Sequence, residues 1–412
     1  MNTFDRNITK LYWMNALNIT GFHFVVYTLF ILSKGFNMQQ FFLLGTAGTM
    51  ASLAAEVPTG MFSDRISRKW CLVIASIIVI PSMFFVITSQ SFVVVLISVV
   101  LDGISKAFVS GTDTAMLYDS LKAANRESEF HKVLGRTRWY SSWASATGGI
   151  LGGLLASLSL SIPFWVAFGI IFPVLFVRLA LKEPPRFAES VSREPQFLHL
   201  KESLQYCVSR QSGYFVMYAA LLTPFVTMSF ALWQPYLKLI SLPVAYFGIF
   251  YAVESLICGF VSRQSASVEK RIGMSRSLLY IPLLLGLGFL LQSQFIFIFG
   301  MLFILLHSVS ESYMKPTLET YINVRIPSSR RATVLSLKSM VSSLKYAVLA
   351  PFLGLAIDVY SLRTGLLALG IIVVLVGLAF YAVFRTQERK VAGQSGDAAT
   401  ESPWTMNRQN TV

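Results

Sequence analysis

Long apolar stretches separated by short polar connections run along almost the whole chain. We count twelve of them, each long enough to cross about 30 Å of hydrocarbon as a helix that rises about 1.5 Å per residue, although the ninth is short. They cover residues 12–33, 38–62, 70–89, 91–117, 135–157, 161–181, 213–237, 243–262, 277–292, 294–316, 332–357 and 363–384. Their apolar character is continuous rather than alternating, which predicts membrane-spanning helices and not the strands of a membrane barrel.

Composition agrees with a membrane protein, because 54% of the residues are hydrophobic and only 13% are charged, against about 25% charged residues in soluble proteins. The net charge of +14 would suit a nucleic-acid partner, but the basic residues fall in alternate connections. These basic connections are 65–69, 122–138, 182–210, 263–276 and 325–331. By the positive-inside rule they face the cytoplasm, which places both termini there and leaves no role for nucleic acid.

A charged segment containing prolines, residues 182–212, divides the chain into two halves. Glu56 and Gly60 in the first half correspond weakly to Glu254 and Gly259 about two hundred residues later, as a repeated six-helix unit would produce. The predicted domains are two six-helix bundles, a cytoplasmic linker and a disordered polar tail, at residues 1–183, 213–386, 184–212 and 387–412, respectively.

The connection after the second apolar stretch reads Gly60-Met61-Phe62-Ser63-Asp64-Arg65-Ile66-Ser67-Arg68-Lys69. The spacing G-x-x-x-D-R-x-x-R-K resembles the signature loop between helices 2 and 3 of the major facilitator superfamily, with Ser67 where that loop usually has a second glycine. The resemblance extends over about residues 10–385. It implies an all-α membrane protein with twelve transmembrane helices in two six-helix bundles, which transports by alternating access.

The same resemblance implies a gating role for this loop. In the superfamily, the residue that corresponds to Asp64 contacts the start of helix 11, here residues 331–334, and stabilises the outward-open state. The gating candidates are therefore Gly60, Asp64, Arg65, Arg68 and Lys69. Asp113 joins them, because it lies near the cytoplasmic end of its span, where capping a helix or contacting a gate suits a carboxylate better than contacting substrate.

Ionisable residues inside spans are costly and need a partner, a cavity or a nearby end. The fourth span carries Asp102 and Lys106, and the tenth carries His307, Glu311 and Lys315, each at offsets of four that share one helix face. Superfamily members line their cavity with helices 1, 4, 7 and 10. Glu311 is the first candidate for proton coupling, with Asp102 and His307 next; the alternative is that these groups pair only to fix helix packing.

The candidates for the substrate cavity are polar and cationic side chains on several spans. Lys345 lies about 20 Å along its helix from the cytoplasmic start, too far to reach that surface easily. The full set is Asn15, Asn18, Lys106, Gln234 and Lys345. For the amides, hydrogen bonds between helices are an equally good interpretation.

The run Gly148-Gly149-Ile150-Leu151-Gly152-Gly153 resembles the glycine-rich helix 5 of the drug–proton antiporters in the superfamily, although the usual proline is replaced by Gly149. Close helix packing is the other interpretation. We therefore predict proton-coupled export of a small amphipathic compound. The alternatives are a proton-coupled uptake symporter for an anionic metabolite, held by Lys106 and Lys345, and a transport-inactive sensor or scaffold.

No P-loop, G-x-S-x-G sequence or metal-spaced set of His and Cys is present, so we expect no enzyme activity, cofactor or metal site. The energy source should then be an ion gradient, of protons or alternatively of sodium. Residues 111–121 look like a segment found in a bacterial subset of the superfamily, which implies a bacterial inner membrane. The expected partners are a small-molecule substrate, protons and membrane lipid, and the expected state is a monomer.

Overall fold

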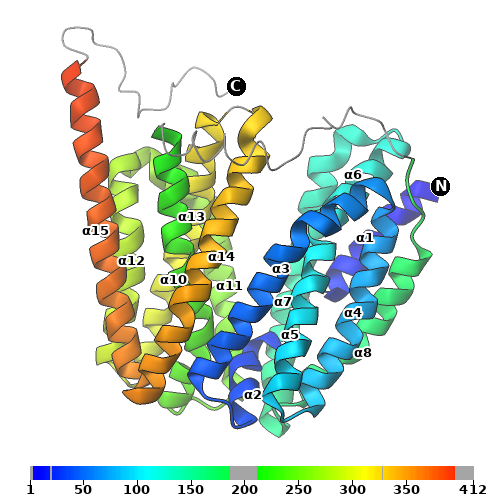
Figure 1. The fold of residues 1–412 in the computed structure, drawn as a ribbon, viewed down its shortest axis with the longest axis horizontal. Coiled ribbons are helices and arrows are strands. Elements are labelled where there is room, and N and C mark those ends of the chain that lie inside the picture. The colour runs from blue at the N-terminus through cyan, green and yellow to red at the C-terminus, as the bar shows by residue number, and fades with distance from the viewer. Residues whose placement is uncertain (1–2, 19–20, 186–210, 327, 395–412) are drawn as a thin grey trace. The chain divides into compact units, whose positions relative to one another are not determined.

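The structure is a computed structural model that describes residues 3–18, 21–185, 211–326 and 328–394 (Figure 1). The regular elements of the described residues are all helices, without strands. The α-helices are α1 (Thr3–Asn18), α2 (Tyr27–Ser33), α3 (Met38–Arg65), α4 (Arg68–Thr88), α5 (Phe92–Val109), α6 (Thr112–Ala123), α7 (Phe130–Leu158), α8 (Ile162–Ala180), α10 (Gln211–Leu239), α11 (Ala245–Ile272), α12 (Met274–Gln294), α13 (Ile304–Arg325), α14 (Ser328–Val359) and α15 (Leu362–Gln394). The 3-10 segments are η1 (Phe24–Val26), η2 (Glu127–Glu129) and η3 (Ile298–Phe303).

Each predicted span overlaps one described helix or a pair of consecutive helical segments. In the described part of the chain, nine helical segments are long and apolar enough to cross a membrane. The other three predicted spans correspond to α1 with η1 and α2, to α7, and to η3 with α13. The prediction of an all-helical, multi-span membrane protein is therefore confirmed.

The chain forms two compact units, of which the first comprises Met1–Glu194, Phe230–Ser255 and Ser343–Tyr360. In this unit α5 lies between α3 and α4, and α1 packs against α6, α7 and α8 (Figure 1). Leu11 and Met14 of α1 are buried with Met116 and Leu121 of α6 in one apolar cluster. The cluster fixes α1 at the end of the unit that carries the basic connections, which we call the basic end.

The second unit comprises Pro195–Ser229, Leu256–Ser342 and Ser361–Val412. Its α12 packs against α13 and α15. Gly286 and Gly370 let α12 and α15 approach closely, since a Cβ on Gly286 would lie 3.1 Å from the Gly370 carbonyl oxygen. The ends of α10, α11 and α14 belong to the first unit, and the boundaries 1–183 and 213–386 stay a prediction.

Two predicted spans are broken helices. In the fourth span α5 ends at Val109 and α6 begins at Thr112, with Gly111 between them at φ +73°. This left-handed conformation favours glycine because a Cβ is strained there. In the first span α1 ends at Asn18 and a helix resumes only with η1 and α2.

Element boundaries differ from the sequence prediction at three places. The signature loop is shorter than expected, since α3 continues to Arg65 and α4 starts at Arg68. The first helix begins at Thr3, not residue 12, because its first turns are held by the end of α8, as described below. Helix α15 continues to Gln394, with an Arg385–Glu388 ion pair at 2.7 Å near its end. The rest of the predicted tail and linker residues 186–210 lie outside the described residues.

Candidate functional site

The second unit contains Glu311, the first candidate for proton coupling from the sequence analysis. Glu311, near the middle of α13, forms an ion pair with Lys315 one turn later, as their spacing allows. The Glu311 side chain is 12% exposed, whereas that of Lys315 is 62% exposed. The pair therefore joins a carboxylate largely enclosed by protein to an ammonium group that is free to move away from it.

His307 lies one turn before Glu311 but packs against the neighbouring helix. Its ring contacts the Phe289 ring of α12 at a centroid distance of 4.0 Å and leans over Gly288. Its Nε2 atom is buried without a hydrogen-bond partner in the described structure. No hydrogen bond joins His307 to Glu311 among the described residues, so a shared proton between them stays a prediction.

The first unit contains a similar pair on α5. Lys106 Nζ lies 2.7 Å from Asp102 Oδ2, and the side chains are 72% and 30% exposed, respectively. The intervening Gly103 faces α3, where a Cβ would collide with the Gly48 backbone. The helices therefore touch at Gly103 while the ion pair remains accessible.

The other cavity candidates have different surroundings. Lys345 on α14 is half-buried and has no ion pair or hydrogen bond with the described residues. Asn15 donates from Nδ2 to the Leu11 carbonyl of its own helix at 3.0 Å, so it does not bridge to another span through this bond. The side chain of Asn18 lies outside the described residues.

Gln234 on α10 is bound by backbone groups instead of lining an open cavity. Its side chain is 1% exposed, and Oε1 accepts hydrogen bonds from the backbone N–H of Thr28 at 2.8 Å and of Leu29 at 3.3 Å. Its Nε2 donates to the Phe24 carbonyl at 2.8 Å. Gln234 thus caps the N-terminus of α2 at the break in the first span, where free N–H groups need an acceptor.

A second cap of this kind joins α14 to α3, also within the first unit. Asp358, close to the end of α14, accepts from the backbone N–H of Met38 at 2.9 Å and of Gln39 at 2.8 Å. The N-cap residue Asn37 binds the next N–H, that of Gln40, at 2.8 Å. The first turn of α3 is therefore fully capped, and two of its three acceptor bonds come from a residue about 320 positions away.

Helices α7 and α11 cross closely near the Gln234 and Asp358 caps. A Cβ on Gly153 would lie 2.7 Å from the Gly248 backbone nitrogen, and one on Gly248 would collide with the Gly149 carbonyl oxygen. Tyr251 of α11 packs over Gly149 and is hydrogen-bonded to Ser145 at 3.1 Å. The glycine run that the sequence singled out thus serves close packing here.

We call these contacts of α10, α11 and α14 with α2, α3 and α7 the gate contacts. They all lie within the first unit. Apart from the contact of Tyr251 with Ser145 near the middle of α7, they lie towards the end opposite its basic connections. They join segments from the two predicted halves of the chain through helix caps and glycine backbones.

The signature residues form a network at the basic end. Arg68 pairs with Asp119 of α6 and donates to the Ala115 carbonyl at 2.6 Å. Glu183, just after α8, accepts from the backbone N–H of Arg68 at 2.8 Å and of Lys69 at 2.9 Å. Together they tie the N-terminus of α4 to α6 and to the end of α8.

The structure shows why a serine can stand at position 67, where the signature loop usually has a second glycine. Ser67 is the N-cap of α4 with an extended backbone (φ −170°), which requires no glycine. Its hydroxyl accepts from the Trp70 N–H at 3.1 Å and donates to Glu183 at 2.6 Å. A glycine here would lose both bonds.

The remaining gating candidates are less engaged. Gly60 is exposed and has no atoms near the position of a Cβ. Asp113 lies in the first turn of α6 and accepts a hydrogen bond from the Thr114 N–H at 2.7 Å. The helix dipole stabilises a carboxylate at this position. The side chains of Asp64 and Arg65 lie outside the described residues, as do those at residues 331 and 332. The contact between Asp64 and helix 11 therefore stays a prediction.

Two residues that the sequence analysis did not single out complete the basic end. Arg178 of α8 is buried, and its Nη1 donates to the Leu72 carbonyl at 2.9 Å and to Ser76 at 2.7 Å on α4. Asn7 of α1 exchanges hydrogen bonds with the backbone of Lys182 at 2.7 and 3.1 Å. Cationic residues near a span end usually reach for the surface, so no pattern in the sequence distinguished Arg178 as buried.

Two charged groups at the basic end, outside the predicted spans, have pKa values shifted by their surroundings. Arg126 binds Asp5 at 2.8 Å and Glu129 at 2.9 Å, and its hydrogen bonds lower the pKa of the Glu129 carboxyl. Burial, followed by the nearby charge of Arg6, lowers the pKa of Lys10, which donates to the Ala180 carbonyl at 2.5 Å. The Glu129 pair should therefore contribute stability at neutral pH and lose it as the pH falls through the lowered pKa.

Glu183 offers a direct test of the network. Replacing it with glutamine removes the negative charge shared by three donors and should lower the stability of the folded protein by about 1–3 kcal/mol. Thermal unfolding of the purified protein in detergent measures this. Glu388→Gln, which breaks only the Arg385 pair at the end of α15, is the control and should change stability by less than about 0.5 kcal/mol. Equal shifts in the two variants would contradict the network.

The sequence profile of the Major Facilitator Superfamily matches residues 11–344 and 237–409, which together cover almost the whole chain. The chain belongs to this superfamily. It is therefore a multi-pass membrane protein and a secondary transporter of a small molecule, and not an enzyme. No curated protein matches it significantly in sequence.

Solved structures of superfamily members share the fold. A point mutant of the nucleoside transporter NupG matches with a TM-score of 0.80 at 14% identity, over 92% of this chain and 100% of that one. A bacterial homologue of the human lysosomal transporter Spinster, inward-facing and unoccupied, matches at 0.72 and 16% identity over 95% and 98%. The POT family transporter PepTSo matches at 0.70 and 10% over 93% and 99%. At these identities the likeness shows the fold alone.

Proposed function

We propose that this superfamily member is a proton-coupled exporter of a small amphipathic cation. The observation that carries the proposal is the Glu311–Lys315 pair, a mostly enclosed carboxylate whose ionic partner is exposed. A proton on Glu311 cancels the attraction to Lys315, and a cationic substrate competes with Lys315 for the same carboxylate. Proton and substrate then bind in alternation at one group, which is the requirement for antiport.

The Asp102–Lys106 pair on α5 repeats this arrangement in the first unit, with a more exposed carboxylate. It gives the transporter a second carboxylate in a span that superfamily members direct to the cavity. We assign it the supporting role, because its exposure of 30% leaves its charge better solvated than that of Glu311. In this proposal, protons that enter the cell drive export. The protein lies in the inner membrane of a bacterium, with both termini in the cytoplasm.

The gate contacts close the end opposite the basic connections in this proposal. Alternating access requires that end to open and the basic end to close, so the caps made by Gln234 and Asp358 must be released in each cycle. The Arg68 and Glu183 network holds the first unit together at the basic end, where Asp64 is expected to contact helix 11.

Asp358 tests the gate. Replacing it with alanine leaves the first two N–H groups of α3 without their acceptor and should disfavour the closed end by about 1 kcal/mol, or about fivefold. Asp358→Asn keeps one acceptor oxygen and should have a smaller effect. Accessibility of a single cysteine at Gln39 to a membrane-impermeant maleimide, in a variant without the native cysteines, measures opening. Equal labelling of the parent, Ala and Asn variants would contradict the role of Asp358.

A second function has its own supporting observation. Lys345 is a half-buried cation in a span and has no ionic partner among the described residues. An organic anion bound there would neutralise it, which favours the uptake symporter for an anionic metabolite.

Accumulation of labelled compounds in liposomes that contain the purified protein tests the two functions against each other. The exporter predicts that a lipophilic cation such as tetraphenylphosphonium accumulates when the interior is acidic, and that a protonophore abolishes the accumulation. The symporter predicts that an organic anion accumulates when the interior is alkaline, and that Lys345→Gln abolishes this. Fluxes that do not depend on the pH gradient would overturn proton coupling in both.

A further inference from the structure

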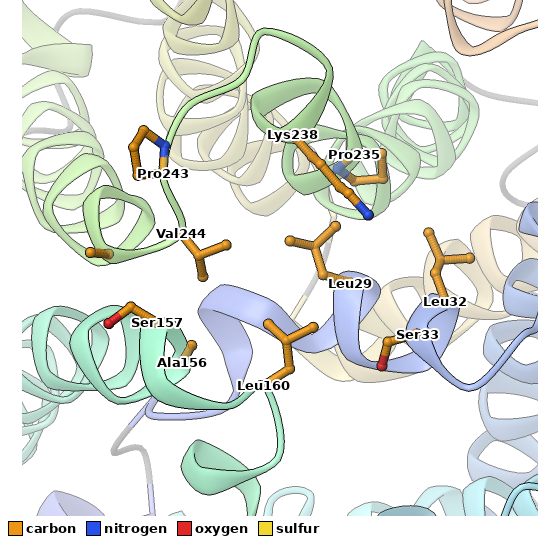
Figure 2. Close-up of a pocket in the computed structure, with 11 residues that line it drawn as sticks. Leu29, Leu32, Ser33, Ala156, Ser157, Leu160, Pro235, Lys238, Pro243 and Val244 are labelled. Carbon is orange, nitrogen blue, oxygen red and sulfur yellow. The ribbon is translucent and has the colours of Figure 1, made fainter.

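A pocket of about 530 Å³ opens beside the gate contacts, at the end opposite the basic connections (Figure 2). Three pieces of the first unit form it: the end of α2, the connection from α7 to α8, and the connection from α10 to α11. The lining residues are Leu29, Leu32, Ser33, Ala156, Ser157, Leu160, Pro235, Lys238, Pro243, Val244 and Ala245. The volume lies within the range of about 300–1,000 Å³ usual for small-molecule sites.

The lining is apolar apart from one cation and two hydroxyl groups. Ser33 and Ser157 each donate to a carbonyl of their own helix at 2.7 Å, so their protons are already used. Lys238 is exposed and has no hydrogen bond or ion pair with the described residues, and no carboxylate is among the lining side chains. The complementary ligand therefore carries one anionic group and an apolar body.

The position of the pocket indicates where such a ligand comes from. Its walls are the last residues of spans, so it lies at the level where hydrocarbon gives way to headgroups. Exposed Trp165 and Tyr246 lie at the same helix ends, as in the aromatic belts of membrane proteins. Exposed Leu158 and Leu239 flank the lining residues in sequence and offer apolar surface for acyl chains.

We propose that this pocket binds an anionic membrane phospholipid, with the phosphate on Lys238 and the first part of an acyl chain against the apolar lining. The lipid would also stabilise the gate contacts, because the pocket and the Gln234 cap share their elements. Leu29 lines the pocket with its side chain while its N–H binds Gln234, and Pro235 follows Gln234 directly. The proposal that lipid binds here depends only on the pocket. The proposed effect of the lipid on the gate contacts rests on the proposed function.

The test uses the full-length protein in nanodiscs that contain a photoactivatable phosphatidylglycerol, or the matching phosphatidylcholine, followed by mapping of the labelled peptides. Lys238→Gln removes the cation from the pocket. Ser157→Trp fills the pocket with a large side chain but leaves Lys238 in place. Arg363→Gln removes an exposed cation at the start of α15, outside the lining, and is the control. Size-exclusion profiles identify any variant that does not fold.

We expect phosphatidylglycerol to label residues 156–160 or 235–245 in the wild type and in Arg363→Gln. Labelling should fall about fivefold in Lys238→Gln, which corresponds to about 1 kcal/mol for one basic residue near an anionic surface. It should fall at least as far in Ser157→Trp. Equal labelling by phosphatidylcholine would overturn selectivity for an anion, and labelling unchanged in both pocket variants would overturn the site.

A free amphiphile or the transported substrate could use the same chemistry, and competition separates them from lipid. Excess oleate or tetraphenylphosphonium should leave the labelling unchanged if the pocket holds bilayer lipid. Displacement by either compound would overturn the assignment to phospholipid. Lipid labelling that persists in Glu311→Gln, which should not transport with proton coupling, would show that the pocket stands independently of the transport proposal.

Discussion

Glu311→Gln should abolish the accumulation of a lipophilic cation driven by a pH gradient, down to the level of liposomes without protein. Glutamine keeps the size of the side chain but binds no proton near neutral pH, so the exchange between proton and substrate at this position is lost. Stability should change by less than about 1 kcal/mol, because Lys315 is 62% exposed and remains solvated without its partner. Downhill movement of the substrate that does not need a proton should persist.

Two variants make this result specific. Glu319 lies two turns further along α13 and is exposed, so Glu319→Gln is a matched control that should retain driven accumulation. Asp102→Asn probes the similar pair on α5 and should reduce accumulation less than Glu311→Gln. Driven accumulation that survives in Glu311→Gln and disappears in Asp102→Asn would move the coupling role to the first unit.

Gly248→Ala should open the end of the first unit that the gate contacts close. The added Cβ would collide with the Gly149 carbonyl oxygen, and a backbone atom on a packed helix cannot turn aside as a flexible side chain could. Overpacking of this kind costs about 1–3 kcal/mol, and here the cost falls only on the arrangement in which α7 and α11 touch. The closed arrangement should therefore be disfavoured by about 5- to 150-fold.

Distances between spin labels at Leu158 of α7 and Tyr246 of α11 measure this shift, since both side chains are exposed. The native Cys71, Cys207 and Cys258 are replaced first. Gly259→Ala is the matched control on the same helix, because a Cβ there meets no atom within 4 Å. We expect a longer distance in Gly248→Ala and no change in Gly259→Ala. Identical distances in both variants would contradict the account of the gate.

The fold was predictable because membrane spans are long, apolar and bounded by charge. Local pairs were predictable for a similar reason: the offset of four in Asp102–Lys106 and Glu311–Lys315 places the side chains on one helix face, and both pairs form. Their roles in coupling stay predictions. The spacing could not show that His307 would turn towards Phe289, since that depends on how α12 packs against α13.

The gate contacts and the Glu183 network were not predictable in the same way. Asp358 binds backbone groups 319 and 320 residues away, and Glu183 binds groups 114 and 115 residues away, so no local pattern connects them. Gln234 was identified as a polar residue in a span, but its cap depends on the break between α1 and α2.

The central claim is that protons and substrate move in opposite directions, and the sign of proton movement tests it most directly. Purified protein is placed in weakly buffered liposomes with a pH dye inside and no imposed gradient, and tetraphenylphosphonium is added outside. The account predicts that the interior becomes more alkaline as protons leave in exchange for the cation, and that Glu311→Gln shows no change. Acidification of the interior in the wild type would contradict antiport and favour a symporter.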